Sequence, residues 1–85
     1  MWIITHDILE HGKQIDVRSR DYDESLKENL IYRFRLLDGD SEVYYEGISD
    51  DCDSENAFAP LDDFGEGHAG CTDIQYLQGD VWEIL

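Results

Sequence analysis

Acidic side chains at alternate positions of one short segment could bind calcium. Asp51, Asp53 and Glu55 alternate, and Asp62 lies eleven positions after Asp51, which is similar to the ligand spacing of a calcium-binding loop. The segment departs from that loop because Asn56 stands where a sharp turn requires glycine, and because a proline interrupts it. We therefore interpret these carboxylates as solvated side chains at the start of a helix, where the helix dipole stabilises negative charge.

A histidine and a cysteine are spaced as metal ligands or as a nucleophile and its base. His68 and Cys71 form a His-x-x-Cys pair, and Cys52 is the other cysteine. Structural zinc has four ligands that usually come as two close pairs, and only one such pair is present. A nucleophilic thiol needs a lowered pKa, whereas surrounding negative charge raises it. We expect no metal, no cofactor and no enzymatic activity, and we expect two thiols in a reducing compartment.

The charge of the chain is distributed unevenly along its length. All six Lys and Arg residues lie within the first 35 positions, and fourteen of the 21 Asp and Glu residues lie in the remaining fifty. The formal net charge is −15, of which the last fifty residues carry −14. Such charge repels nucleic acid and anionic membranes and attracts an electropositive protein. We therefore expect a basic protein surface as the partner, with no direct binding to nucleic acid or membrane.

Two groups of residues form the predicted contact surface. The first group is Asp50, Asp51, Asp53, Glu55, Asp62, Asp63 and Glu66, and the second, at a hairpin tip, is Asp38, Asp40, Glu42 and Tyr44. Tyr44 is the predicted aromatic anchor, because the expected strand register turns it away from the core. A rigid row of carboxylates resembles the phosphates of nucleic acid, which carry one charge per about 1.7 Å of duplex. The predicted function is inhibition or regulation of a nucleic-acid-binding protein by occupying its basic cleft.

The alternative function is a small structural or accessory interaction domain whose charge serves only solubility. Contacts of such a domain would use a hydrophobic face of its sheet, and neutralising the acidic segment would leave binding unchanged. Length favours one domain, residues 1–85, and an apolar fraction of 41% with 12% aromatic residues favours a folded scaffold over an acidic tail. The apolar start at Trp2–Ile4 has no signal-peptide pattern, so we expect a cytoplasmic location.

Alternating apolar residues predict an antiparallel α+β domain of five or six strands built from hairpins. A first hairpin turns at residues 11–13, and a second turns at Asp38-Gly39, a dipeptide typical of two-residue turns. This turn would place Phe34 opposite Val43, Tyr32 opposite Tyr45, and Arg35 opposite Glu42. A third hairpin with the three-residue loop 78–80 would align Ile74 and Tyr76 with Trp82 and Ile84, whereas a two-residue turn would place Glu83 on their face.

Short helical segments are predicted near 22–28 and 54–64. Asp21 to Glu24 has the form of a capping box, and Tyr22, Leu26 and Leu30 recur every fourth residue, which indicates one or two helical turns or else an irregular acidic loop. Phe58, Leu61 and Phe64 are spaced like one apolar side of a helix, and Pro60 suits a first turn. We expect this second helical segment to stop at Gly65, with residues 65–70 as a flexible connector.

Two resemblances accompany these patterns. Residues 21–25, Asp-Tyr-Asp-Glu-Ser, and Glu28-Asn29 resemble a short stretch of the phage inhibitors of uracil-DNA glycosylase, over less than a tenth of the chain. In size and charge the chain also resembles immunity proteins and the inhibitor of barnase, all small acidic inhibitors of basic enzymes. The segment 49–65 resembles small uncharacterised bacterial proteins, a likeness that implies no activity. No functional residue is carried over from any of these families.

Overall fold

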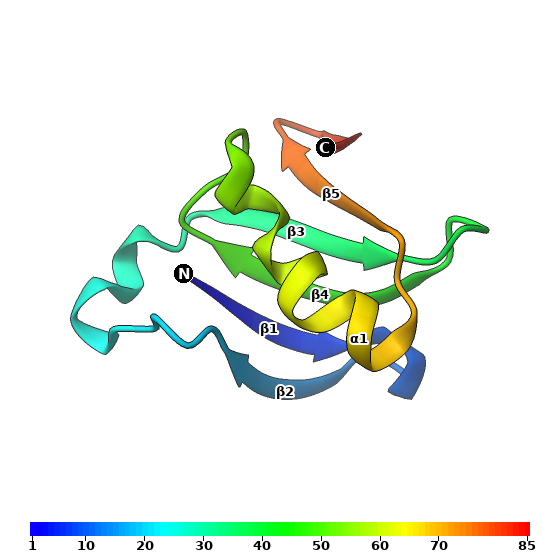
Figure 1. Ribbon diagram of the computed structural model, residues 1–85, viewed down its shortest axis with the longest axis horizontal. Coiled ribbons are helices and arrows are strands. Elements are labelled where there is room, and N and C mark those ends of the chain that lie inside the picture. Colours follow the sequence, from blue (N-terminus) through cyan, green and yellow to red (C-terminus); the bar gives the residue numbers. More distant parts are fainter.

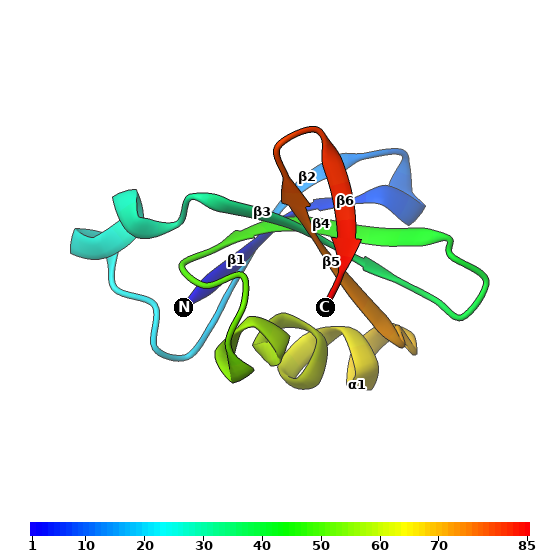
Figure 2. The same ribbon diagram turned by 90° about the horizontal axis from the view of Figure 1, so that it is seen from above.

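A six-stranded antiparallel sheet and a helical layer on one of its faces make up the fold (Figures 1 and 2). The computed structural model describes residues 1–85, and the strands lie in the order β2-β1-β4-β3-β5-β6. The strands are β1 (Trp2–Asp7), β2 (Lys13–Arg18), β3 (Tyr32–Leu37), β4 (Val43–Ser49), β5 (Asp73–Gln78) and β6 (Val81–Ile84). The predicted α+β class and the antiparallel sheet built from hairpins are confirmed.

The helical layer is one continuous segment whose type of turn changes along its length. It begins as a 3-10 turn, η3 (Glu55–Phe58), passes through a π turn, η4 (Leu61–Gly65), and ends as α1 (Glu66–Ala69). The prediction that the helix stops at Gly65 is wrong. Gly65 lies inside the helix and packs closely against the sheet. A side chain would not fit there, because a Cβ atom would lie 2.9 Å from Leu36 Cδ1. Gly70, at φ 69°, ends the helix instead.

The other predicted helical segment is a 3-10 helix that begins two residues later and ends one residue later than expected. This element, η2, spans Glu24–Asn29, and its N-cap is Asp23, whose side chain accepts a hydrogen bond of 3.0 Å from the backbone N–H of Ser25. Asp21 was the expected capping residue, but its carboxylate lies 3.5 Å from the N-terminal ammonium group. The segment links β2, at the edge of the sheet, to β3 on the far side of β1 and β4 (Figure 1).

The register predicted for the β3–β4 hairpin is wrong. Phe34 lies opposite Gly47, Tyr32 opposite Ser49 and Arg35 opposite Glu46, with an irregularity next to Leu37. The carboxylate of Asp38 causes part of this shift, because it accepts backbone hydrogen bonds of 2.9 Å from both Asp40 and Glu42 and so holds a wider loop than a two-residue turn. The N-terminal hairpin is confirmed, with Ile4 opposite Val17 and a left-handed turn at residues 11 and 12.

The preferred register of the β5–β6 hairpin is also wrong. Gln78 pairs with Val81, which leaves a two-residue turn at Gly79-Asp80, and Tyr76 pairs with Glu83. This register places Glu83 on the same side of the sheet as the buried Tyr76, and it places Trp82 and Ile84 on the opposite side. Trp82 is stabilised there by arginine side chains from β3 rather than by the core.

The hydrophobic core lies between the sheet and the helical layer. Nine buried residues form it: Trp2, Ile4, Phe34, Leu36, Ala57, Leu61, Cys71, Ile74 and Tyr76. The phenol of Tyr76 on β5 donates a buried hydrogen bond of 2.8 Å to the carbonyl of Ala57 in η3. This bond and the surrounding apolar contacts fix the helical layer on the sheet, and they determine which acidic side chains of that layer face solvent.

Candidate acidic interface

The helical layer and the loop before it bear all seven carboxylates of the first predicted group. Residues 50–69 contain no Lys or Arg, and they cover only one face of the sheet (Figure 2). The loop at 50–55 and the β3–β4 tip lie at opposite ends of this layer (Figure 1). The two predicted acidic groups therefore occupy separate places, and the larger group lies along the helical layer and the loop before it.

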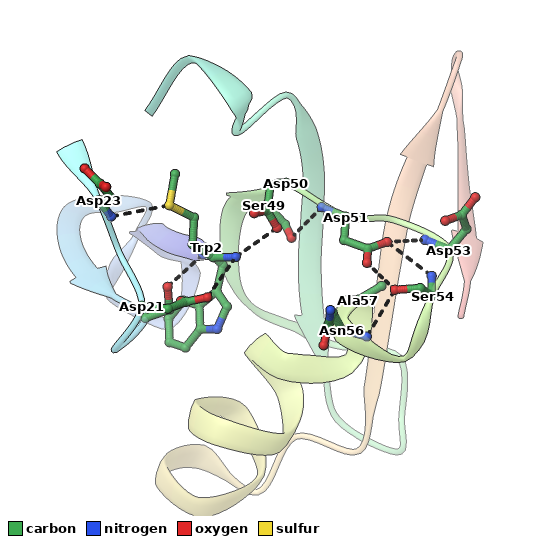
Figure 3. A network of polar contacts seen from close by, with 12 residues as sticks. Trp2, Asp21, Asp23, Ser49, Asp50, Asp51, Asp53, Ser54, Asn56 and Ala57 are labelled. Carbon is green, nitrogen blue, oxygen red and sulfur yellow. Dashed lines mark hydrogen bonds and ion pairs between the residues drawn. The ribbon is translucent and has the colours of Figure 1, made fainter. Parts of the chain in front are cut away.

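The side chain of Asp51 stabilises the loop that precedes the helical layer (Figure 3). Its carboxylate accepts backbone hydrogen bonds of 3.1 Å from Asp53 and from Ser54, and a further short hydrogen bond from the Ser54 hydroxyl. These hydrogen bonds, that of the Ser54 hydroxyl above all, hold the pKa of Asp51 below its usual value. Ser54 in turn accepts a hydrogen bond from the backbone of Asn56 and caps η3. Asp51 therefore shapes the acidic surface and is only half-exposed on it.

Asp50 is neutralised within the chain. Its carboxylate accepts a hydrogen bond of 2.8 Å from the N-terminal ammonium group, which also lies 3.5 Å from Asp21. Figure 3 shows Asp50 next to Ser49, the last residue of β4. Asp50 and Asp51 are thus the two members of the first predicted group that have partners inside the molecule.

The other five members of that group are free. Asp53, Glu55, Asp62, Asp63 and Glu66 are all exposed, and none forms an ion pair within the chain, whose four ion pairs involve other carboxylates. The sequence pattern placed Glu55, Asp62 and Asp63 correctly in a helical segment, whereas it placed Glu66, which begins α1, in a connector. It gave no means of separating the free residues from Asp50 and Asp51, because that separation depends on how the loop folds back on itself.

The second predicted group is arranged differently from the expectation. Asp38 is occupied by backbone hydrogen bonds, of which that from Glu42 contributes most to keeping the pKa of Asp38 below its usual value. Tyr44 does not point freely outward, because it is half-buried against the core. A hydrogen bond with Asp38 raises the pKa of the Tyr44 phenol. Asp40 and Glu42 remain exposed at the tip.

Phe58 is an exposed aromatic side chain that the sequence pattern assigned to the buried side of a helix. It is 37% exposed, whereas Leu61 is 8% exposed. The change from 3-10 to π turns between these residues breaks the regular spacing on which the prediction depended. Phe58 thus lies on the acidic layer between exposed carboxylates on either side of it in the sequence, and it is more exposed than Tyr44, the predicted aromatic anchor.

A cleft of about 800 Å³ lies beside the acidic layer. Trp2, Val17, Ala59 and Phe64 give it apolar walls, and polar residues, Asp63 among them, line the rest. The rings of Trp2 and Phe64 meet edge to face, with their centroids 6.4 Å apart. The sequence analysis did not find this cleft, because its walls come from β1, β2 and the helical layer and no local pattern connects them.

Both cysteines are free thiols, and Cys71 lies in the core. Burial raises the pKa of the Cys71 thiol to about 11, so the thiol is protonated at neutral pH and is a poor nucleophile. His68 is exposed and stacks on Phe64 with ring centroids 4.6 Å apart. No three His, Cys, Asp or Glu side chains converge as metal ligands would.

The buried Cys71 thiol predicts a loss of stability in alkaline solution. Because the pKa of this thiol rises from 9.0 unfolded to about 11 folded, its contribution is complete below pH 9 and is lost as the pH rises to about 11. Urea unfolding at several pH values, compared with Cys71→Ala, isolates this contribution from that of the tyrosines. We expect a shallower decline between pH 9 and 11 in the variant. Parallel declines for the two proteins would contradict the prediction.

Comparisons with known proteins give no family for this chain. No protein-family model, no curated protein and no solved structure matches it. None of its helices has the length and apolar character that crossing a membrane requires.

Proposed function

We propose that the helical layer is an interface for an electropositive protein, in whose cleft its carboxylates take the place of nucleic-acid phosphates. The observation that supports this most is the set of five exposed carboxylates that lack a cation: Asp53, Glu55, Asp62, Asp63 and Glu66. Uncompensated like charge on one layer costs folding free energy through self-repulsion. A cationic partner removes that cost, so the relief of repulsion adds to the free energy of binding.

The proposed mechanism is competitive occlusion. The −15 charge of the chain draws a basic partner in over long range, which raises the association rate. Short-range contacts then form between the carboxylates and the Lys and Arg residues that would otherwise hold phosphates. Phe58, with 37% of its surface exposed, supplies an apolar contact among these charges, as aromatic residues do at the centres of interfaces. Nucleic acid and this protein cannot occupy the partner's cleft together.

A comparison of two charge-matched variants tests this proposal. The first variant carries Asp53→Asn, Glu55→Gln, Asp62→Asn and Glu66→Gln, all on the acidic layer. The control variant carries four changes of the same kind at exposed sites outside residues 50–69: Glu10→Gln, Glu28→Gln, Asp80→Asn and Glu83→Gln. Each variant is immobilised, and proteins from the source cell are captured at low salt and eluted by rising salt.

We expect the natural chain and the control to retain basic proteins. The affinity of the first variant for these proteins should fall at least about tenfold, since several charge pairs worth up to about 1 kcal/mol each are removed. Adding the natural chain should also displace a labelled oligonucleotide from a captured protein. Retention of neutral or acidic proteins only, capture that is indifferent to salt, or equal losses from both variants would contradict the proposal.

A further inference from the structure

The second surface with unusual features is the face of the sheet that the helical layer does not cover (Figure 2). Arg33 and Arg35 lie on this face, because they alternate with the buried Phe34 on β3. Trp82 and Ile84 of β6 lie on it too, since Arg35 pairs with Gln75 and Gln75 pairs with Ile84. The uncovered face therefore brings basic and apolar side chains together in an acidic protein.

The side chains of Arg33 and Arg35 extend from β3 across β5, so their guanidinium groups lie near the edge strand β6. The Cζ atom of Arg35 lies 4.4 Å from the ring centroid of Trp82, and that of Arg33 lies 5.8 Å from it. Arg35 Nε also donates a hydrogen bond of 2.8 Å to Gln75 Oε1. Neither arginine forms an ion pair, although the chain has 21 Asp and Glu residues for six Lys and Arg. The positive charge held over Trp82 therefore has no carboxylate within 4 Å, although Glu46 lies opposite Arg35 on β4.

The β6 strand has fewer protecting features than the opposite edge of the sheet, although it is only four residues long and carries the exposed Glu83. It is the last strand in the sheet order, and its sequence, Val-Trp-Glu-Ile, has neither Pro nor Lys. Val81 and Ile84 are 60% and 64% exposed. The opposite edge, β2, contains Lys13 and an Asp16–Arg18 ion pair. Of the two edges, β6 is the one suited to receive another strand.

We infer that the β6 edge binds an extended segment of a partner polypeptide that alternates acidic and apolar side chains. A strand added beside β6 gains backbone hydrogen bonds. Its residues on the uncovered face would lie next to Trp82, with Cβ atoms about 4.5–5.5 Å from their neighbours, so a carboxylate there meets the guanidinium groups of Arg33 and Arg35. Its residues on the other face would lie beside Val81 and Glu83, so an apolar side chain fits beside Val81 and a second carboxylate there would be repelled by Glu83.

The backbone and the net charge both favour a polypeptide over a nucleic acid at this edge. Only a polypeptide can continue the hydrogen-bonding ladder of a sheet. A nucleic acid also repeats its negative charge along its whole length, and the −15 charge of this protein repels each phosphate that lies beyond the two arginines. A short peptide brings few charges, which the two guanidinium groups can neutralise. This inference is independent of the proposed function, which places a cationic partner on the other face.

The test uses eight-residue peptides and the backbone amide NMR spectrum of the whole chain. The first peptide alternates glutamate with valine or threonine. The second carries lysine in place of glutamate, the third and fourth are the glutamate peptide N-methylated at its odd or at its even residues, and a single-stranded oligonucleotide is the fifth probe. Chemical-shift changes at β6 and at the Trp82 indole report binding at the edge, and changes at residues 50–69 report binding to the acidic layer.

We expect the glutamate peptide to shift β6 resonances, and we expect N-methylation in the pairing register to weaken this binding at least about tenfold, because it removes ladder hydrogen bonds. Arg33→Gln with Arg35→Gln should weaken it similarly. Added salt should leave this affinity unchanged or raise it, since screening reduces the overall repulsion, whereas it should weaken lysine-peptide binding to the acidic layer. No shift at β6, no effect of N-methylation in either register, or a stronger response to the oligonucleotide would overturn the inference.

Discussion

Replacing Gly47 by alanine is expected to destabilise the protein by about 3 kcal/mol, near the upper end for the insertion of one methyl group into a packed interior. A Cβ atom at this position would lie 2.2 Å from the carbonyl oxygen of Ile3 and 2.5 Å from Cζ of Phe34. The Phe34 ring could move, but the Ile3 oxygen belongs to the backbone of the neighbouring strand β1. No change of side-chain rotamer relieves that contact, so the central strands must separate.

The measurement is urea unfolding followed by circular dichroism, with Gly67→Ala as the matched control. Gly67 lies in α1, is exposed, and has no atom within 4 Å of its virtual Cβ position. The control should stabilise the protein by up to about 1 kcal/mol, because alanine loses less entropy than glycine in a helix. A domain of 85 residues has a stability of roughly 4–13 kcal/mol, so the two midpoints should separate clearly. Midpoints that move together would contradict the prediction.

Gly47 also explains why the register of the β3–β4 hairpin could not be predicted from local rules. The Asp38-Gly39 dipeptide favours a two-residue turn, and the flanking residues fit that turn. The observed register is selected by the contact of Phe34 with a strand position that has no side chain, thirteen residues away in the sequence. Alternation of apolar residues was enough to identify both strands, because it depends only on neighbours along the chain. Pairing between strands depends on contacts that the pattern does not contain.

The β5–β6 hairpin was predicted in the wrong register for a different reason. The prediction assumed that Trp82 and Ile84 must lie in the core, as large apolar residues usually do. In the structure, Arg33 and Arg35 cover part of Trp82 on the uncovered face, and a cation over an aromatic ring is an alternative to burial. Ile84 remains 64% exposed. Trp82 and Ile84, both large apolar residues that lie outside the core, belong to the proposed strand-binding edge.

The sequence was enough to predict that residues 50–66 are acidic and partly helical, but not which of their carboxylates are free at the surface. The charge asymmetry and the helical pattern of residues 54–64 are visible in the sequence, and the structure places them on one layer. Which carboxylates are free was not visible, because Asp51 is occupied by hydrogen bonds within its own loop and Asp50 by the chain terminus. The sequence pattern ended the helical segment at Gly65 because glycine commonly ends helices, whereas here Gly65 permits close packing.

Tyr76 joins the sheet to the acidic layer, and truncating it should have the largest effect of any single change at that junction. Its side chain is 1% exposed, and its ring lies 5.8 Å from that of Phe34, centroid to centroid. Tyr76→Ala is expected to cost about 3–5 kcal/mol, as large aromatic truncations in cores do. Such a loss approaches the whole stability of a small domain. We therefore expect Tyr76→Ala to be largely unfolded at 37 °C, as seen by circular dichroism.

Tyr76→Phe separates the hydroxyl group from the packing of the ring. This variant keeps the apolar contacts but leaves the carbonyl of Ala57 without its hydrogen bond of 2.8 Å, which should cost about 1–3 kcal/mol because that acceptor is buried. Since the bond ties η3 to β5, the amides of residues 55–60 should exchange hydrogen faster in the variant, while those of β1 and β4 should change less. The loosened layer should also bind a cationic partner more weakly, although no charge has been altered. Uniform acceleration of exchange across the chain, or no change in urea midpoint, would show that the hydroxyl does not hold the acidic layer in place.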